Sequence, residues 1–367
     1  MTTIETSKEF LLKPLSTVTG IVEKRHTMPV LSNVLIEQTS STLKMLGTDL
    51  EIQVTTTEPT QNTGNARFTT SAKKLQDILK ALPDFQPIKL ELDNNKLLIK
   101  SGKSRFNLHT LPADDLPTLE INPNVVSSFT VSQNQFKNLL YKIQFSMANQ
   151  DIRYYLNGLF LNVSAGSLKL VATDGHRLAY IDSTLVGDIT PCEAIIPRKT
   201  IVELSKLLND SNEALHIQIC ANQIRFNFGN IELISKVIEG KFPDYNRVIP
   251  TNNKKVISLN RSVLTHALQR VSILSNEKFR GIRVMLQDNI LKIQAANSEQ
   301  EEAIEELDID YKDEPLDIGF NITYLLDFLT HGDTENISIA LSDGNGSALI
   351  SEPENENFRY VVMPMRI

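Results

Sequence analysis

The fold is decided by the stretch VLIEQTSSTLKMLGTDLEIQV, residues 34–54, whose pattern occurs twice more, in LFLNVSAGSLKLVATDGHRLAY (159–180) and VMLQDNILKIQAANSEQEEAIEEL (284–307). Each stretch predicts a strand, a short polar turn and a second strand, followed by a break and further chain. Leu43, Leu168 and Leu291 take the same place in the three stretches, with spacings of 125 and 123 residues. A period this long indicates a domain-sized repeat, because solenoid repeats are about 20–50 residues long.

Two amphipathic helices are predicted in each repeat. Apolar residues recur at helical spacing in the segment that opens each repeat, as Leu139, Leu140 and Ile143 do in the second. Ser71 and Asn321 stand where a helix N-cap is expected. The predicted opening helices span 10–23, 136–147 and 263–274, and the predicted second helices span 72–82, 197–208 and 322–329. Each repeat therefore reads as helix, hairpin, helix and further strands, which predicts an α+β fold.

Polar stretches rich in proline or asparagine separate the repeats at 121–128 and 250–255. They divide the 367 residues into three predicted domains, 1–126, 127–252 and 253–367. Three copies of one scaffold with different residues on each copy favour an architectural protein over an enzyme.

The composition excludes several classes of protein. No run of about 18 apolar residues is present, so no membrane-spanning helix is predicted. The first residues, MTTIETSKEF, lack the apolar core of a signal peptide, which predicts a cytoplasmic protein. Cys192 and Cys220 have no C-x-x-C partner and are interpreted as reduced thiols. Neither a metal site nor a cofactor is predicted.

The net charge of −7 is unevenly distributed. Residues 1–126 contain 14 basic residues (Lys and Arg) and 14 acidic residues (Asp and Glu). Residues 127–252 contain 12 basic and 11 acidic residues, and residues 253–367 contain 11 basic and 19 acidic residues. The acidic excess is concentrated in EQEEAIEELDIDYKDE (299–314), which indicates either a solvated edge or an assembly edge that faces basic residues elsewhere. A net acidic chain argues against tight, salt-sensitive binding of nucleic acid but permits a loose topological embrace.

The sequence carries no known catalytic motif: the P-loop, the dinucleotide fingerprint, the nucleophile elbow and the H-E-x-x-H zinc pattern do not occur. The strongest candidate is the segment 173–177, Thr-Asp-Gly-His-Arg, which offers groups for acid–base or phosphate chemistry. The first repeat has Thr48-Asp49-Leu50 in the same place, without the His or the Arg. Thr-Asp is therefore interpreted as part of the scaffold, because such residues build turns. The Gly-His-Arg that follows is a local addition that favours a binding surface over catalysis.

Several long motifs follow one another along the chain: QDIRYYLNG (150–158), VATDGHRL (171–178), GKFPDYNRVIP (240–250), ILSNEKFRG (273–281) and YVVMPMRI (360–367). Together they resemble the bacterial DNA polymerase III beta subunit family, the replication sliding clamps. The likeness extends over the whole chain through KPL, GTDLE, SRFNLHTLP and SEQEEA. The resemblance implies a non-catalytic ring of two identical chains joined head to tail. Each chain would supply three domains of one fold, with helices lining the hole and sheets forming the outer wall.

The resemblance implies that the ring encircles double-stranded DNA and tethers a polymerase for processive synthesis. Such a ring slides without strong contacts, and water-mediated contacts between helices and phosphates carry no sequence information. The resemblance places Arg25, Gln150, Tyr154 and Tyr155 near DNA. Adjacent tyrosines in a polar loop suit stacking on bases or packing on sugars. The alternative is that one of them, Tyr155 rather than Tyr154, packs into its own domain.

The resemblance also implies a mostly apolar cleft between the second and third domains. It would hold short linear peptides of the DNA polymerase III alpha subunit, the clamp loader and other polymerases or repair proteins. Leu, Val, Met and Pro suit an adaptable pocket, and Arg177, Arg247 and His176 would hold peptide carbonyls or acidic groups. The predicted cleft residues are Leu156, Thr173, Gly175, His176, Arg177, Leu178, Pro243, Arg247, Val248, Tyr324, Ser347, Val361, Val362, Met363, Pro364, Met365 and Arg366.

Three points qualify this cleft. Val361 and Val362 also fit ordinary strand core. The terminal MPMR would normally fray unless it is docked. Asn345 stands where an apolar residue is expected in relatives, so the sequence does not determine which residues form the rim of the pocket.

A subunit junction is predicted between the first domain and the third domain of a second copy. Arg105, Phe106 and Leu108 lie in an alternating strand pattern with Arg105 on the opposite face. Basic residues of the first domain would face acidic residues of the third, and apolar contacts would dominate the affinity. The predicted junction residues are Lys74, Lys103, Arg105, Phe106, Leu108, Ile273, Leu274, Glu299, Glu301, Glu302 and Glu305.

Two other interpretations stay open. One is an enzyme on the triplicated scaffold with Asp174 and His176 as an acid–base pair, which a pH-dependent turnover lost with His176→Ala would support. The other is a regulatory or damage-tolerance paralogue of the clamp, which genetic essentiality would distinguish from the main replicative ring.

Overall fold

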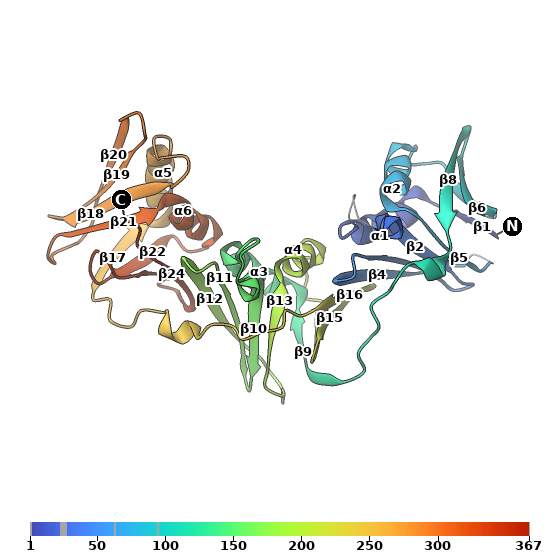
Figure 1. Ribbon diagram of the computed structural model, residues 1–367, viewed down its shortest axis with the longest axis horizontal. Helices are drawn as coiled ribbons and strands as arrows, with labels where there is room; N and C mark the ends of the chain where they lie inside the picture. Colours follow the sequence, from blue (N-terminus) through green and yellow to red (C-terminus); the bar gives the residue numbers. More distant parts are fainter. Residues whose placement is uncertain (1, 23–27, 62–63, 94, 367) are drawn as a thin grey trace. The chain divides into compact units, whose positions relative to one another are not determined.

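The computed structural model describes residues 2–22, 28–61, 64–93 and 95–366. The chain divides into two compact units, one formed by residues 1–136 and 202–237 and the other by 137–201 and 238–367. Each unit is described by itself below, and Figure 1 follows the elements from blue to red. No helix among the described residues combines the length and the apolar character needed to cross a membrane.

The elements occur three times in the same order: strand, helix, three strands, and then the same series again. In the first repeat they are β1 (Thr2–Thr6), α1 (Lys8–Thr19), η1 (Pro29–Ser32), β2 (Asn33–Gln38), β3 (Thr42–Thr48), β4 (Ile52–Pro59), β5 (Ala66–Ser71), α2 (Ala72–Ala81), β6 (Ile88–Asp93), β7 (Lys96–Ser101), β8 (Ser104–Leu111) and η2 (Ala113–Asp115). The predicted pattern of strand, turn and strand is confirmed by β2 and β3. α1 and α2 pack together over this sheet (Figure 1).

The second and third repeats confirm the predicted period. The second consists of β9 (Val125–Ser132), α3 (Gln133–Ile143), η3 (Gln144–Ser146), η4 (Tyr154–Leu156), β10 (Gly158–Ser164), β11 (Ser167–Thr173), β12 (Arg177–Thr184), β13 (Cys192–Pro197), α4 (Arg198–Leu207), β14 (Ala214–Cys220), β15 (Gln223–Phe228), β16 (Ile231–Lys236) and η5 (Tyr245–Arg247). The third consists of β17 (Lys255–Asn260), α5 (Arg261–Ser272), β18 (Gly281–Gln287), β19 (Ile290–Ala296), β20 (Glu302–Asp308), β21 (Leu316–Asn321), α6 (Ile322–His331), β22 (Asn336–Leu341), β23 (Ala348–Glu352) and β24 (Asn355–Val362).

Helix N-caps account for the earlier starts of α1 and α3, whereas α1, α3 and α5 end at Thr19, Ile143 and Ser272, before the predicted ends. The Ser7 hydroxyl accepts a hydrogen bond from the Phe10 N–H at 3.3 Å, so α1 begins before the first apolar residue of the pattern. The Ser132 hydroxyl accepts from the Gln135 N–H in the same way at 3.1 Å, and α3 begins with polar residues. Ser71 and Asn321 are the predicted N-caps of α2 and α6. The predicted linker 121–128 overlaps the start of β9. Val125 and Val126 are both exposed, so the strand does not begin with the alternation of apolar and polar residues that predicts a strand.

Strand pairing joins successive repeats within each unit. In the first unit one sheet has the order β1-β6-β7-β8-β5-β2-β3-β4-β16-β15-β14-β9, and in the second unit the sheets have the orders β13-β10-β11-β12-β24-β23-β22-β17 and β20-β19-β18-β21. The joint between the first and second repeats is the antiparallel pair β4 and β16, with Gln53 opposite Ile234. The joint between the second and third repeats is β12 and β24, with Leu178 opposite Val361. The two joints use the same strand of successive repeats.

The Thr-Asp turns have the same geometry in the first two repeats. In the first, the Thr48 hydroxyl accepts from the Leu50 N–H at 3.1 Å and donates to the Ile52 carbonyl at 3.0 Å. In the second, the Thr173 hydroxyl accepts from the Gly175 N–H at 3.1 Å and donates to the Arg177 carbonyl at 2.6 Å. Thr-Asp is therefore part of the scaffold, as predicted. Leu50 holds φ at 78°, a left-handed conformation that costs a side-chain-bearing residue roughly 1–2 kcal/mol.

A buried ion pair ties α3 to the third repeat inside the second unit. The Lys142 ammonium lies 2.8 Å from both a carboxylate oxygen of Glu352, whose side chain is fully buried, and one of Asp333. Burial alone would lower the pKa of Lys142, but the hydrogen bonds to Asp333 and Glu352 outweigh it and the pKa is raised. The side chain therefore stays charged at neutral pH. It also lies over the ring of Phe358, 5.2 Å from the ring centre.

Candidate functional site

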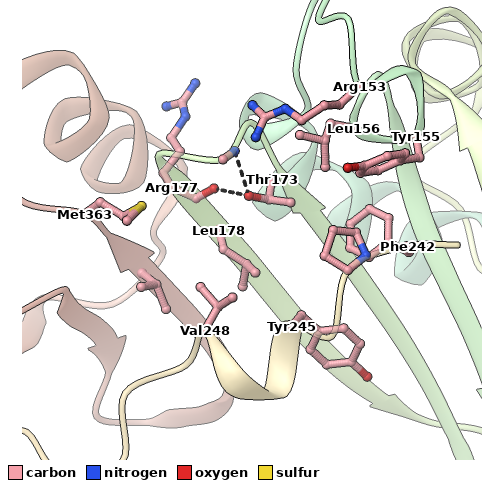
Figure 2. A pocket seen from close by; sticks show the side chains of 13 residues that line it. Arg153, Tyr155, Leu156, Thr173, Arg177, Leu178, Phe242, Tyr245, Val248 and Met363 are labelled. Atoms are coloured by element: carbon pink, nitrogen blue, oxygen red, sulfur yellow. Dashed lines mark hydrogen bonds between the residues drawn. The ribbon is translucent and has the colours of Figure 1, made fainter.

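An apolar cavity of about 300 Å³ lies in the second unit, beside the joint of β12 and β24. Its walls come from η4, the Thr-Asp turn, β12, the segment around η5 and the chain that follows β24 (Figure 2). Met363 and Tyr155 lie on opposite sides of it in Figure 2. The lining residues are Arg153, Tyr155, Leu156, Thr173, Gly175, Arg177, Leu178, Phe242, Pro243, Tyr245, Val248, Val361 and Met363.

A cluster of buried side chains supports the apolar wall. Phe160 and Val171 face each other on β10 and β11 and pack with Leu178. Phe242 stacks on Phe160 with ring centres 4.7 Å apart and planes 11° apart. Tyr245 adds a tilted ring contact with Phe160 at 6.0 Å. The segment after β16 therefore contributes aromatic rings to the cavity as well as the connection to the third repeat.

The chain after β24 is held against the cavity by backbone hydrogen bonds. The Met363 N–H donates to the His176 carbonyl at 2.9 Å, and the Met365 N–H donates to the Gly319 carbonyl at 2.8 Å. Met363 and Met365 are therefore anchored, and Met363 forms part of the cavity wall. Val361 is buried and lines the cavity, whereas Val362 is fully buried in the strand. Val362 is therefore an ordinary core residue of the strand, which was the alternative interpretation.

Arg177 is fully engaged by its own chain. Its Nε donates to Asp174 at 3.0 Å, one Nη donates to Asp327 on α6, and the other donates to the Phe145 carbonyl at 2.8 Å. Its guanidinium carbon lies 4.5 Å from the ring centre of Tyr324. The side chain is only 10 % exposed. Arg177 thus links the Thr-Asp turn to α6. It also lines the cavity, and its role toward a peptide stays a prediction.

The Thr-Asp turn does not form an acid–base pair. One oxygen of Asp174 accepts the backbone N–H groups of His176 at 2.9 Å and Arg177 at 3.1 Å, and the other accepts Arg177 Nε. The His176 side chain is exposed. Because the carboxylate is occupied by the turn and by Arg177, this geometry supports the binding interpretation over the catalytic one.

Arg153 lines the cavity and is held by Asp151. The guanidinium donates to Asp151 at 2.9 Å and 3.0 Å and to the Asp174 carbonyl at 3.2 Å. The hydrogen bonds from the Arg153 side chain and backbone lower the pKa of Asp151 from 3.8 to about 2. The pair is therefore fully formed above the ordinary pKa of an aspartate and is lost only as the pH falls through about 2.

The two adjacent tyrosines have different surroundings. Tyr155 packs against the cluster beneath the cavity and lines it, while Tyr154 is 59 % exposed. Tyr155 thus follows the alternative of packing into its own domain, and the DNA-binding role of the exposed Tyr154 stays a prediction. Gln150 is exposed with φ at 59°. Arg25 lies outside the described residues.

The cavity brings together nine of the predicted cleft residues: Leu156, Thr173, Gly175, Arg177, Leu178, Pro243, Val248, Val361 and Met363. The other predicted cleft residues do not line it. Arg247 is 87 % exposed and pairs with Asp244, and the Ser347 carbonyl accepts from Asn253. Tyr324 packs on Arg177. Asn345 is exposed on the turn between β22 and β23.

Sequence reasoning missed Arg153, Tyr155, Phe242 and Tyr245 as lining residues. The motif GKFPDYNRVIP contains Phe242 and Tyr245. Two aromatic residues in a connection with two prolines were a usable signal, because a solvated linker has no need of them.

The predicted junction residues lie on α2 and β8 of the first repeat, at the end of α5 and on β20 of the third, and on the turns before the two strands. On β8, Arg105 is exposed, Phe106 half-buried and Leu108 buried, which confirms the alternation. Ile273 is 77 % exposed at the end of α5. Glu305 on β20 accepts two hydrogen bonds from Arg270 of its own chain, each at 2.7 Å, and these lower the pKa of Glu305. Its role toward a second chain stays a prediction. Leu274 is half-buried, and the remaining predicted residues, Lys74, Lys103, Glu299, Glu301 and Glu302, are exposed.

Family models match nearly the whole chain in three parts. The N-terminal, central and C-terminal domains of the DNA polymerase III beta subunit match residues 2–120, 130–244 and 246–366. A beta sliding clamp of Pseudomonas aeruginosa is 45% identical over 363 residues, and one of Escherichia coli is 42% identical over 361 residues, each over 98% of both chains.

Solved structures of sliding clamps are similar over the whole chain. A crystal structure of the Pseudomonas aeruginosa clamp bound to griselimycin has a TM-score of 0.95 at 44% identity and covers 100% of both chains. A clamp of Caulobacter crescentus has a TM-score of 0.94 at 34% identity, again over 100% of both chains.

We predict that Arg177→Ala destabilises the second unit by about 3 kcal/mol or more, because it leaves the carboxylates of Asp174 and Asp327 without their shared cation. Arg247→Ala is the matched control, since its exposed pair with Asp244 contributes only about 0–1 kcal/mol. Urea unfolding followed by circular dichroism measures both. Equal unfolding midpoints for the two variants would contradict the structural role of Arg177.

Proposed function

Because the chain belongs to the DNA polymerase III beta subunit family, the beta sliding clamps, we propose that two copies of it close a ring that encircles duplex DNA and tethers the replicative polymerase. The chain is a processivity subunit and has no catalytic step of its own. Its three clamp domains repeat one mixed helix-and-sheet scaffold. Its place of action in this proposal is the cytoplasm, where bacterial DNA is replicated.

The observation that carries the ring is the pair of equivalent joints. The third strand of one repeat, β4 or β12, pairs with the last strand of the next repeat, β16 or β24. By the same rule, β20 of the third repeat should pair with the last strand of another repeat. In the described chain β20 pairs only with β19. The equivalent last strand of the first repeat is β8. A second copy of the chain supplies it, and two such joints close a ring.

The existing joints also give a register for the proposed one. Ile52 stands opposite Ser235 and Arg177 stands opposite Val362. The pairing within each hairpin shows which residues are equivalent in the three repeats. Glu301 takes the place of Ile52 and Arg177. Leu108 takes the place of Ser235 and Val362. In the proposed junction Glu301 faces Leu108 of the partner subunit. Ala303 then faces Phe106 of the partner subunit.

We predict that the pair Ala303→Cys with Phe106→Cys forms a disulfide between subunits under mild oxidation. Directly opposed residues in an antiparallel pair have Cα atoms about 4.5–5.5 Å apart, which a disulfide spans. Non-reducing electrophoresis detects the cross-linked dimer, and light scattering confirms its mass.

The off-register pair Glu302→Cys with Phe106→Cys is the control, because neighbouring residues of a strand project to opposite faces. The unmodified chain, with Cys192 and Cys220, provides the background. If only the off-register pair formed a cross-link, the strands β20 and β8 would pair in a different register from the proposed one. A monomeric protein with no cross-link in either pair would contradict the ring.

DNA retention in this proposal depends on closure instead of charge. The chain carries a net charge of −7, so a large basic footprint is not what holds it. Gln150 and the exposed Tyr154 lie in one loop and offer weak contacts with the backbone or bases. Together with Arg25, they are proposed to guide loading.

We predict that protein loaded on nicked circular DNA stays bound in about 0.5 M salt, whereas a conventional binder loses about 10³–10⁵ in affinity already between 50 and 200 mM salt. Gel filtration of the loaded complex before and after cutting the circle once measures retention. Loss from the linear form alone is the expected result. Equal, salt-dependent loss from both forms would indicate conventional binding.

The cavity beside β12 and β24 is the proposed docking site for partner peptides. It is apolar, it has Met363 and Tyr155 at its edges, and Arg153 adds a cation that Asp151 holds in place. The crystal structure of the Pseudomonas aeruginosa clamp with griselimycin supports ligand binding by this family. Extended segments of the polymerase III alpha subunit, the clamp loader and other polymerases or repair proteins are the proposed occupants.

We predict that deletion of residues 363–367 weakens the peptide Gln-Leu-Ala-Leu-Ala by about thirtyfold or more, because a central anchor contributes about 2 kcal/mol or more. The peptide is designed with alternate leucines so that both face one side when it is extended. Calorimetric titration measures the affinity, and light scattering checks that the dimer persists. Unchanged affinity in the truncated protein would remove the cleft assignment.

A further inference from the structure

The scaffold that builds the cleft occurs a second time, in the first repeat. Leu35 stands opposite Leu46 on β2 and β3, as Phe160 stands opposite Val171 on β10 and β11. Both pairs belong to a buried apolar cluster. Leu31 of η1 takes the place of Leu156 of η4, and both are buried. The floor of the cleft therefore has a counterpart inside the first unit.

The rims of the two places correspond as well. The Lys236 N–H donates to the Glu51 carbonyl at 2.9 Å, just as the Met363 N–H donates to the His176 carbonyl at 2.9 Å. Leu116 follows η2 as Val248 follows η5, and each donates its N–H to the carbonyl three residues earlier. The two places differ in exposure, however. Leu116 is 4 % exposed, whereas Val248 is 42 % exposed beside the open cavity.

One difference between the two places lies at a turn position. Gly175 lines the open cavity with φ at 88°, and Leu50 has the equivalent φ of 78°. The Leu50 side chain packs against the cluster of Leu31, Leu35 and Leu116. Leucine strongly disfavours this backbone conformation and glycine does not. Leu50 thus occupies a position where the backbone favours glycine. Its side chain fills the space that corresponds to the cavity of the second repeat.

We infer that the residue after the Asp of the Thr-Asp turn decides which of the two equivalent clefts can bind a peptide. Gly175 leaves the cleft of the second repeat open, and Leu50 occupies the cleft of the first repeat from within. An ion pair between Lys236 and Glu51 at 3.3 Å stands at the rim where the second repeat has Met363 and His176. The ligand class of the closed place is the same as that of the open one, an extended apolar peptide. This inference rests on the proposed docking role of the open cleft.

The first test is Gly175→Leu. The added side chain starts 2.8 Å from the nearest Arg153 guanidinium nitrogen, so it enters the space in which the peptide binds. We expect the affinity for the Gln-Leu-Ala-Leu-Ala peptide to fall by about thirtyfold or more in calorimetry. Gly175→Ala is the matched control, because it has the same backbone strain and its single methyl group meets only the terminal guanidinium of Arg153. It should lose about threefold or less. Equal losses in the two variants would attribute the effect to strain and overturn the inference.

The reciprocal test opens the closed place. Leu50→Gly combined with Lys236→Met reproduces the turn and the rim of the second repeat in the first. We expect calorimetry to give about two peptides per chain in place of one, with the affinity of the original cleft unchanged. Leu50→Met with Lys236→Met keeps the volume of the side chain and should keep a single site. One site in both double variants, with wild-type binding intact, would overturn the inference.

A thermal measurement tests the inference separately from peptide binding. If Leu50 fills a cleft, Leu50→Gly should lower the unfolding midpoint by about 2 °C or more although it relieves the backbone strain. A midpoint that rises or stays the same would show that the side chain contributes no packing and would overturn the inference. Failure of the unmodified protein to bind the peptide would instead count against the proposed docking role. The two proposals are therefore distinguishable.

Discussion

Antiparallel pairing between strands of successive repeats is the constraint on which the rest of this structure depends. At the joint of β12 and β24, Leu178 and Val361 are opposed and both buried, and the continuous ladder fixes their register. A shift by one residue would exchange the buried and exposed faces of β24. The same ladder sets where residue 363 leaves the sheet. The cavity and its terminal wall are therefore consequences of how one repeat attaches to the next.

Charged groups reinforce this joint in addition to the strand ladder and the apolar packing. Lys142 connects α3 with Glu352 and Asp333, and Arg177 connects the Thr-Asp turn with Asp327 on α6. Buried pairs contribute little net stability compared with apolar side chains of similar size, but leaving one partner alone is strongly unfavourable. Such pairs therefore act mainly on geometry: they penalise any arrangement of the two repeats in which the ions separate.

Duplication explains why a site and its closed counterpart exist in one chain. The turns at Thr48 and Thr173 share their hydrogen bonds almost atom for atom, so the scaffold places the following residue in the same left-handed conformation. The side chain at that position then varies independently of the fold. Gly175 and Leu50 show how one residue on a common scaffold separates a binding surface from a packed core.

The sequence by itself determined the period, the hairpins, the six helices of the three repeats and the Thr-Asp turns, because these depend on neighbours within a few residues along the chain. The resemblance to the clamp family, read from long motifs, supplied most of the residues around the cavity. Tertiary structure decided what these residues do there. The resemblance placed Arg177 in the cleft, but only the folded chain shows that it also pairs with Asp327, 150 residues away. Phe242 and Tyr245 were overlooked because only the stacking on Phe160 places them at the cavity. Partners that are distant in sequence leave no local periodicity, so the roles of these side chains depend on the folded chain.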